Sequence, residues 1–205
     1  ERIGDTVKFA KENKLSIFVL GGGSDILVSD RGFNGVVIKY VGKSIERIGD
    51  RVTAQAGTKW DDLVKFTVEH NLQGMECMSG IPGTVGASPI QNIGAYGQEV
   101  KDTLLSLRAF EFKSGKFIKF LNKDCEFGYR ESFFKKPENR QRFLITAVTF
   151  MLKKYKDADL SLQNIRDEIL RVRTEKLENP KDVGNAGSFF KNPVLDNNSY
   201  SELKK

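Results

Sequence analysis

Two glycine-rich segments have the composition needed to bind the phosphates of a ligand. The first is Gly21-Gly22-Gly23-Ser24-Asp25. Glycine lets the backbone approach a ligand closely and adopt positive φ, and consecutive backbone N–H groups can bind an anion. Ile26 replaces the third glycine of the Rossmann dinucleotide fingerprint, and no Gly-Lys-Ser/Thr of a Walker A loop follows. Alone, the segment fits a phosphate loop of another kind and a plain hairpin turn equally well.

The second segment, Ser79–Gly97, is longer and combines glycines with prolines. Its apolar members can anchor it to a core: Ile81, Val85, Ile90 and Ile93. A loop of this length without a ligand is unusual in a compact domain. Two such segments in one chain therefore indicate a long cofactor that carries a pyrophosphate and a flat ring.

Short strands and a helix are expected to position the first segment. Hydrophobic runs and turn residues predict a helix up to Glu12, capped by Asp5, and then three strands, Ser16–Leu20, Ile26–Val28 and Val36–Tyr40. The first forty residues thus form a small βαβ-like lobe, in which the glycines lie between two strands.

A second section is expected to position the longer segment. Its predicted strands are Arg51–Ala56, Leu104–Phe112, Lys116–Leu121 and Phe143–Leu152. Its predicted helices are Lys59–Asn71, capped by Thr58, and a long helix that Ser161 caps and that runs through Leu177.

Composition restricts the class of partner. The chain has 205 residues, a net charge of +6, and 39% hydrophobic and 29% charged residues, which is typical of a folded globular protein with anionic partners. The basic residues form no long run and do not alternate with aromatic ones as in a nucleic-acid-binding module, so we expect no nucleic-acid partner. No apolar stretch approaches the roughly 20 residues of a membrane span, and the spacing of Cys77 and Cys125 fits no metal site. Both cysteines are expected to be reduced, as in a cytoplasmic protein.

Four blocks of residues occur in order along nearly the whole chain. They are Leu20–Asp25, then Ile81–Gly86 with Gln91–Gly97, then Cys125–Ser132, and last Arg173–Leu177 with Gly184–Pro193. In this order the blocks resemble those of the UDP-N-acetylenolpyruvoylglucosamine reductase family, which are FAD enzymes of peptidoglycan precursor synthesis. Each block is weak alone, and the order of all four makes the resemblance specific.

The resemblance implies an α+β fold, the two-lobed FAD-binding fold of the vanillyl-alcohol-oxidase type. Two lobes hold FAD between them and a third lobe covers the substrate. On this basis residues 1–42 form the first FAD-binding lobe, residues 43–177 the second, and residues 178–205 the beginning of the substrate-binding lobe.

The resemblance also implies the reaction. NADPH reduces FAD, and the flavin N5 then gives hydride to the enolpyruvyl group of UDP-N-acetylglucosamine enolpyruvate, which a proton converts to UDP-N-acetylmuramate. The implied protein is a cytoplasmic monomer with a UDP-sugar substrate and without nucleic-acid or membrane partners. It serves cell wall biogenesis, and through it cell shape and cell division.

Two residues match the catalytic residues of the family. Addition of hydride beside a carboxylate builds negative charge there, which an arginine can bind, and Arg130 matches the family's arginine for this task. Ser188 matches the proton donor, and we expect Phe189 and Phe190 to form a wall that keeps water out. Taken alone, Arg130 would fit a surface salt bridge and Ser188 a loop serine.

Further residues are assigned to binding by the same matches. The substrate-binding candidates are Tyr129, Lys176 and Asn192. The cofactor-binding candidates are Gly21, Gly22, Gly23, Ser24, Asp25, Gly83, Thr84, Gly86, Ser88, Gln91, Asn92, Gly94, Tyr96 and Arg173. No metal ligand is expected.

Three departures from the family pattern affect these expectations. Asp25 stands where the family usually has Asn, and its carboxylate would repel a pyrophosphate unless it accepts backbone N–H groups. Only Lys153–Leu160 separates a strand from the next helix where part of the family carries a tyrosine-bearing insertion, so substrate capping is expected to differ. The catalytic glutamate that the family places near its C-terminus has no counterpart, and we expect the chain to be a fragment cut at both ends.

Two alternatives remain open at this point. One is another flavin oxidoreductase of the same fold with a different substrate. The other is a catalytically incomplete FAD-binding fragment.

Overall fold

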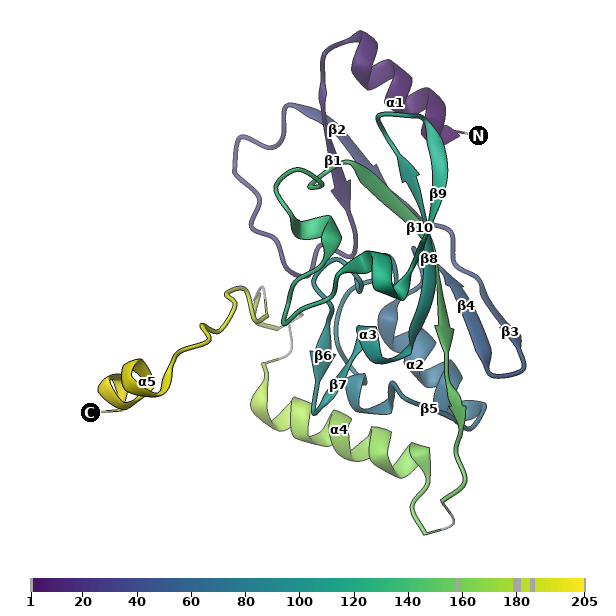
Figure 1. The fold of residues 1–205 in the computed structure, drawn as a ribbon, viewed down its shortest axis with the longest axis vertical. Coiled ribbons are helices and arrows are strands. Elements are labelled where there is room, and N and C mark those ends of the chain that lie inside the picture. Colours follow the sequence, from purple (N-terminus) through teal and green to yellow (C-terminus); the bar gives the residue numbers. More distant parts are fainter. Residues whose placement is uncertain (1, 158, 179–181, 185–186, 205) are drawn as a thin grey trace.

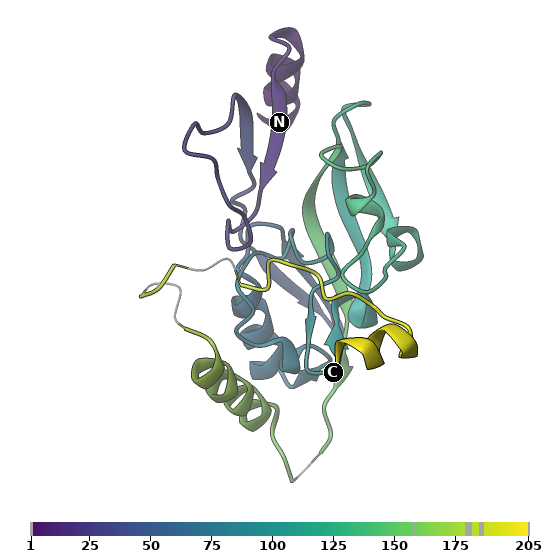
Figure 2. The same cartoon turned by 90° about the vertical axis from the view of Figure 1, so that its left-hand side faces the viewer.

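The chain forms two packed lobes and an extended C-terminal segment (Figures 1 and 2). The computed structural model describes residues 2–157, 159–178, 182–184 and 187–204. In the first lobe, helix α1 (Arg2–Glu12) leads into strand β1 (Ser16–Leu20), which pairs in parallel with β2 (Gly35–Lys39). A loop between β1 and β2 carries the first glycine segment, Gly21–Asp25.

The second lobe is built on a five-stranded antiparallel sheet with the strand order β3-β4-β10-β8-β9. The strands are β3 (Ile45–Ile48), β4 (Arg51–Gln55), β8 (Leu104–Glu111), β9 (Lys116–Leu121) and β10 (Phe143–Met151). Helix α2 (Trp60–Glu69) contributes Trp60, Leu63 and Val64 to the main hydrophobic core, together with residues of the sheet such as Phe150.

The remaining elements are short, except for helix α4 (Leu162–Lys176). They are β5 (Leu72–Gln73), β6 (Gly94–Ala95), β7 (Gln98–Glu99), α3 (Val100–Thr103), β11 (Lys153–Lys154), α5 (Asn197–Leu203) and the 3-10 helices η1 (Glu76–Met78), η2 (Asn122–Cys125) and η3 (Phe133–Lys135). The segment that ends in α5 runs across the face of the second lobe in Figure 2 and leaves the body of the molecule in Figure 1.

Strand β10 contributes to two hydrophobic cores because its side chains alternate between the two faces of the sheet. Ile145 lies in the main core, whereas Leu144 packs in a second cluster with Val7 of α1 and with Phe110 and Phe112. Residues of β1 and β2 pack against this second cluster. The sheet of the second lobe therefore also forms one wall of the first lobe.

Most predicted elements are confirmed to within about two residues. The predicted strands other than Ile26–Val28 all form, and Ser161 caps α4 by accepting a hydrogen bond from the backbone N–H of Asn164. Strand β3, which pairs with β4, was not predicted, and neither were the two-residue strands β5, β6, β7 and β11.

Three local predictions are wrong. Residues 26–28 form no strand, because Leu27 is 88% and Val28 61% exposed and no described strand pairs with them. Asp5 lies in the first turn of α1, which begins at Arg2, and so is not its cap. Thr58 does not cap α2, whose N-cap is Lys59 without a side-chain hydrogen bond.

Helix α4 is attached to α2 by an ion pair between Arg166 and Asp61. Both guanidinium Nη atoms of Arg166 donate to the carboxylate at 2.7 Å, and the arginine side chain is only 7% exposed. Asp61 also accepts a hydrogen bond from the backbone N–H of Gly80 at 2.6 Å. Burial acts to raise the pKa of Asp61, but Arg166, the Gly80 N–H and the charge of Arg173 together hold it below its ordinary value.

Loss of this ion pair should destabilise the fold at neutral pH. Asp61→Asn leaves the buried Arg166 without its counter-ion, and we expect the free energy of unfolding at pH 7 to fall by about 2 kcal/mol. Because the folded-state pKa is depressed, the contribution is present above the unfolded pKa of about 4 and disappears as the pH falls through the folded value. Urea unfolding of wild type and variant at pH 7 and pH 3 measures both effects.

The matched control is Glu12→Gln, which removes the surface pair between Glu12 and Lys8. This pair is exposed, so its loss should change the free energy of unfolding by less than about 0.5 kcal/mol. A wild-type advantage over Asp61→Asn that is equally large at both pH values would contradict the assignment.

Candidate functional site

The two glycine segments meet backbone to backbone although they come from different lobes. A methyl group added at Gly22 would lie 3.0 Å from Cα of Gly83, and one added at Gly21 would lie 3.1 Å from Cβ of Ala87 and 3.3 Å from Oγ1 of Thr84. Gly83 has a φ of +118°, which side-chain-bearing residues rarely adopt. The close approach therefore depends on glycine on both sides.

The second segment is fixed by the chain around the start of α2. Backbone hydrogen bonds join Val85 N to Thr58 O at 2.9 Å, Gly86 N to Ala56 O at 2.9 Å and Trp60 N to Gly83 O at 3.1 Å. Val85 is fully buried, and Ile81, Ile90 and Ile93 pack against the main core, as predicted for these anchors. The segment thus keeps a defined shape without regular secondary structure.

Two predicted cofactor-binding residues use their side chains to support this segment. The Ser88 hydroxyl donates to Val85 O at 2.8 Å and the residue is 1% exposed. Asn92 is fully buried and its backbone is left-handed, with a φ of +45°. Contact of either residue with a cofactor stays a prediction, and the structure gives their side chains internal partners.

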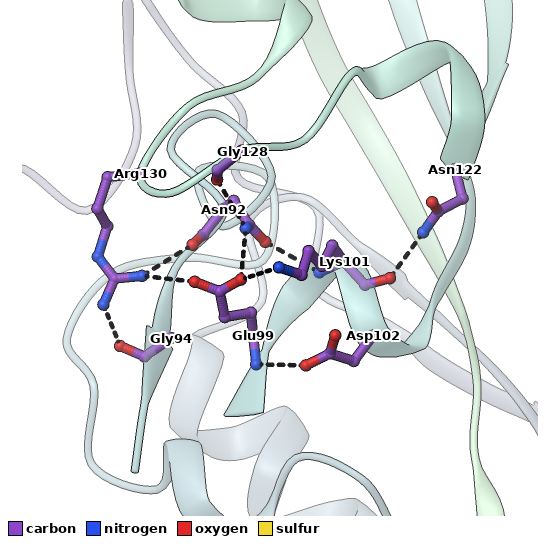
Figure 3. Close-up of polar contacts among 8 residues, drawn as sticks. All are labelled: Asn92, Gly94, Glu99, Lys101, Asp102, Asn122, Gly128 and Arg130. Atoms are coloured by element: carbon purple, nitrogen blue, oxygen red, sulfur yellow. Dashed lines mark hydrogen bonds and ion pairs between the residues drawn. The ribbon is translucent and has the colours of Figure 1, made fainter. Parts of the chain in front are cut away.

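The Asn92 side chain joins three parts of the site (Figure 3). Its amide nitrogen donates to Gly128 O at 3.0 Å and to Oε2 of Glu99 at 3.1 Å, and its oxygen accepts from Lys101 N at 2.9 Å. The glycine segment, the β6–β7 hairpin and the turn at Gly128 are thereby held together.

Arg130 lies in that turn in a strained backbone conformation. Gly128 and Glu131 exchange backbone hydrogen bonds of 3.1 and 3.2 Å, and Arg130 between them has a φ of +53°. A side-chain-bearing residue rarely adopts such an angle, and strained residues of this kind cluster at functional sites. The turn places the arginine side chain beside the glycine segment.

The guanidinium of Arg130 is fixed mainly by carbonyl groups (Figure 3). Nη2 donates to Gly94 O at 2.6 Å and Nη1 to Asn92 O at 3.2 Å, whereas the ion pair from Nη1 to Glu99 Oε1 is long, at 3.4 Å. Its side chain remains 29% exposed. Besides its ion pair with Glu99, Arg130 is thus held by two backbone carbonyls, and it presents a partly exposed positive charge to solvent.

The shorter ion pair of Glu99 is with Lys101 and not with Arg130. Its Oε2 lies 2.6 Å from Nζ of Lys101. Burial acts to raise the pKa of Glu99, but the hydrogen bonds and charges of Lys101, Asn92 and Arg130 together lower it below its ordinary value. Sequence reasoning missed Glu99 and Lys101, since no spacing rule connects Glu99 with an arginine 31 residues away.

The residues predicted on the C-terminal segment lie at the surface. Ser188, Lys176 and Asn192 are exposed. Phe189 and Phe190 are 48% and 86% exposed and contact each other with a centroid distance of 5.4 Å, so the predicted water-excluding wall is not formed in this structure. The rings have no core to enter because the segment runs extended over the surface.

One contact joins this segment to the turn of Arg130. Nζ of Lys191 lies 3.0 Å from Oε1 of Glu131 and 5.7 Å from the ring centroid of Tyr129, which is 42% exposed. The cation of Arg130 lies 5.3 Å from the same ring. Tyr129 is thus between the arginine and the segment of Ser188, and Lys191 is a contact residue that was not predicted.

Arg173 lies over the beginning of the second glycine segment. A methyl group added at Gly80 would lie 3.2 Å from its Nε and 2.8 Å from Cδ2 of Leu170. Tyr96, at the other end of the segment, is 48% exposed and has a φ of +48°.

The residues present fit a nucleotide cofactor such as FAD. The contact between glycine segments leaves backbone in reach of a ligand, as phosphate binding requires. Asp25 and Gln91, one from each segment, join at 3.4 Å through Nε2 of the glutamine and an oxygen of the carboxylate. The other carboxylate oxygen, Oδ1, is buried without a hydrogen-bond partner among the described residues.

Other kinds of site find no support in the described residues. No group of three or more His, Cys, Asp or Glu side chains in that part of the chain could hold a metal ion. None of the helices described there is long and apolar enough to cross a membrane.

Comparison with known sequences gives specific matches. The model of the family described as "FAD binding domain" matches residues 1–120. UDP-N-acetylenolpyruvoylglucosamine reductase of Neisseria gonorrhoeae is 40% identical over 95% of this chain, which covers 62% of that protein. The corresponding protein of Flavobacterium johnsoniae is 41% identical over 95% of this chain, which covers 64% of it. The chain thus spans less than two thirds of the length of these relatives.

Comparison with solved structures agrees with the sequence matches. UDP-N-acetylenolpyruvylglucosamine reductase from Thermus caldophilus matches 97% of this chain and 70% of its own with a TM-score of 0.72 and 25% identity. The likeness to 6-hydroxy-D-nicotine oxidase from Arthrobacter nicotinovorans (TM-score 0.52, 20% identity, 74% of this chain and 34% of that one) concerns the fold alone. The predicted resemblance and the predicted FAD-binding fold of the vanillyl-alcohol-oxidase type are confirmed. The chain belongs to the FAD binding domain family and has the fold of the UDP-N-acetylenolpyruvoylglucosamine reductases.

Proposed function

We propose that this chain binds FAD between the segments Gly21–Asp25 and Gly83–Tyr96 and forms the FAD-binding part of a UDP-N-acetylenolpyruvoylglucosamine reductase. The observation that carries the proposal is the close approach of the two glycine segments, in which a methyl group added at Gly22 would lie 3.0 Å from Cα of Gly83, beside the fixed guanidinium of Arg130. The similarity of about 40% identity to reductases of that name over 95% of the chain supports the substrate class.

After reduction by NADPH, the flavin of FAD would supply the hydride that reduces the enolpyruvyl group. The residues of the chain have the other tasks. The glycine backbone binds the diphosphate, with Ser24, Thr84 and Arg173 beside it. Tyr129, Lys176 and Asn192 bind the UDP-sugar.

In this proposal Arg130 binds the carboxylate next to the reacting double bond. Its guanidinium is already oriented by Gly94 O and Asn92 O, so little reorganisation is needed when negative charge develops. Glu99 is shared between two cations, at 2.6 Å from Lys101 and 3.4 Å from Arg130, so the three side chains together keep a positive charge. The charge of Arg130 remains available to a second carboxylate, that of the substrate.

We assign the proton donor to Ser188. What supports this is the matching sequence block and the contact of its segment with the Tyr129 turn through Lys191 and Glu131. Its exposed position means that the segment must be covered in the working protein before a serine hydroxyl can act as an acid, since serine is a poor acid in water.

The second substrate, the oligomeric state and the cellular role are proposed from the resemblance to the reductase family. We propose use of NADPH, a cytoplasmic monomer without nucleic-acid or membrane partners, and a role in cell wall biogenesis, cell shape and cell division. Residues 1–42 and 43–177 would be the two FAD-binding lobes and residues 178–205 the beginning of the substrate-binding lobe. The turnover concerns the whole protein, whereas FAD binding can be tested on this chain.

FAD binding should depend on the contact between the glycine segments. Gly22→Val places a branched side chain against the backbone of Gly83 and separates the segments, so we expect FAD affinity to fall more than tenfold in a titration followed by flavin fluorescence. The control is Gly4→Val in α1, where nothing lies within 4 Å of an added methyl group. Equal FAD affinity of Gly22→Val and wild type would refute the proposed site, as would the absence of FAD binding by the wild type.

Arg130 should be essential for turnover and dispensable for FAD binding. Arg130→Lys keeps the charge but lacks the planar guanidinium whose two nitrogens donate to Gly94 O and Asn92 O, so we expect kcat/KM of the whole reductase to fall by about 10²-fold or more. Flavin absorbance should remain that of the wild type. Arg51→Lys, at an exposed position of β4, is the control that should leave turnover unchanged. A kcat/KM of Arg130→Lys near that of the control would exclude the role of Arg130.

A further inference from the structure

The carboxylate of Asp25 has a buried oxygen without a partner at the junction of the two glycine segments. The side chain follows directly on Gly21–Ser24 and is half-buried. Oδ2 lies 3.4 Å from Nε2 of Gln91, which belongs to the other segment. Oδ1 is inaccessible to solvent in the structure and accepts no hydrogen bond from any described residue.

A buried carboxylate oxygen can accept hydrogen bonds but cannot donate them while it is ionised. Left unpaired it is unfavourable, and nearly all such groups in folded proteins have a partner. Backbone N–H groups of the described residues, which could offset the charge of Asp25, do not supply one. No cation of the described residues lies within 4 Å of it either, since none forms a salt bridge with Asp25.

A phosphate oxygen cannot satisfy this carboxylate, because both groups are acceptors and both are negative. A hydroxyl or a ring N–H can. The backbone N–H groups of the glycine segments have the opposite preference, since they donate to anions. The site therefore has two chemically distinct parts within a few residues of each other.

We propose that Asp25 Oδ1 accepts a hydrogen bond from a hydroxyl or ring N–H of the bound nucleotide and so sets which part of the nucleotide lies at the junction. Gln91 holds the carboxylate in place by donating to its other oxygen. On this inference Asp25 favours binding instead of opposing it through repulsion of the diphosphate. The inference rests on the proposed binding of FAD.

The test measures affinity and needs no turnover. FAD, riboflavin and ADP are titrated into the wild-type chain, Asp25→Ala, Asp25→Asn and Asp30→Ala, with flavin fluorescence or calorimetry as the readout. Asp30→Ala removes the same charge from an exposed position in the same loop and is the matched control.

We expect Asp25→Ala to bind FAD about tenfold more weakly or worse, because a hydrogen bond to a charged acceptor is lost. Asp25→Asn keeps the shape and one neutral acceptor and should lose less. Asp30→Ala should stay within about twofold of the wild type. The loss should reappear with riboflavin if the donor is on the flavin or its ribityl chain, and with ADP if it is on the adenosine.

An increase in FAD affinity on removal of the Asp25 carboxylate would overturn the inference. If Asp25 mainly repels the diphosphate, Asp25→Ala binds FAD more tightly, the gain shrinks at high salt, and riboflavin affinity does not change. Unchanged FAD affinity of both Asp25 variants would overturn it as well. If Asp25→Ala does not fold, as judged by circular dichroism, the FAD affinity of Asp25→Asn is compared with that of the wild type. Weaker binding by Asp25→Asn then supports the inference, and equal or tighter binding overturns it. A wild-type chain that binds no FAD would instead refute the proposed function.

Discussion

A segment whose only regular secondary structure in the described chain is the two-residue strand β6 has to keep one shape at the centre of this molecule, and most of the other elements serve that constraint. Backbone hydrogen bonds such as Ala87 N to Thr84 O and Ile93 N to Ser88 O define turns within Ser79–Gly97, and contacts with other elements fix its position. Its beginning is fixed by Asp61, which accepts from Gly80, its middle by the burial of Val85, and its end by the side chain of Asn92. Helix α2 supplies Asp61, which α4 holds through Arg166, and the turn at Gly128 supplies the carbonyl that binds Asn92.

The same constraint explains the unusual backbone at the candidate active site. Asn92 and Arg130 both adopt left-handed conformations, which cost free energy for residues with a side chain. The cost is offset because each side chain then reaches several carbonyl or carboxylate groups of neighbouring elements. An arginine held in this way has a fixed direction before any ligand arrives, which is what binding of a developing charge requires.

Much of the frame could be predicted from the sequence because apolar patterns report burial directly. The strands β8, β9 and β10 and the helix α4 with its Ser161 cap follow from alternation and capping, and the isoleucines and Val85 of the glycine segment were correctly expected to be anchors. Local propensity failed at Leu27 and Val28, which have strand-forming side chains but no partner strand. Hydrophobicity likewise failed at Phe189 and Phe190, since an apolar ring is buried only where another element covers it.

The polar part of the site was less accessible to sequence reasoning. The glycine segments were found from their composition and Arg130 through a family resemblance, and their chemistry is consistent with the geometry. Glu99, Lys101 and Lys191 were not found, because their partners lie far away in the sequence or on another element. Pairings of this kind depend on the tertiary fold, which no periodicity or spacing encodes.

The alternation of side chains along β10 has a consequence for how the molecule can be divided. Val7, Ile17 and Ile38 of the first lobe are covered by Leu144, Phe110 and Phe112 of the sheet in the second. A polypeptide that ended near residue 42 would leave this apolar surface in water, and the sheet without the first lobe would expose its own side of the contact. The two lobes are distinct in shape but share a hydrophobic cluster, so a cut between them would produce two fragments with exposed apolar surfaces instead of two independently folding domains.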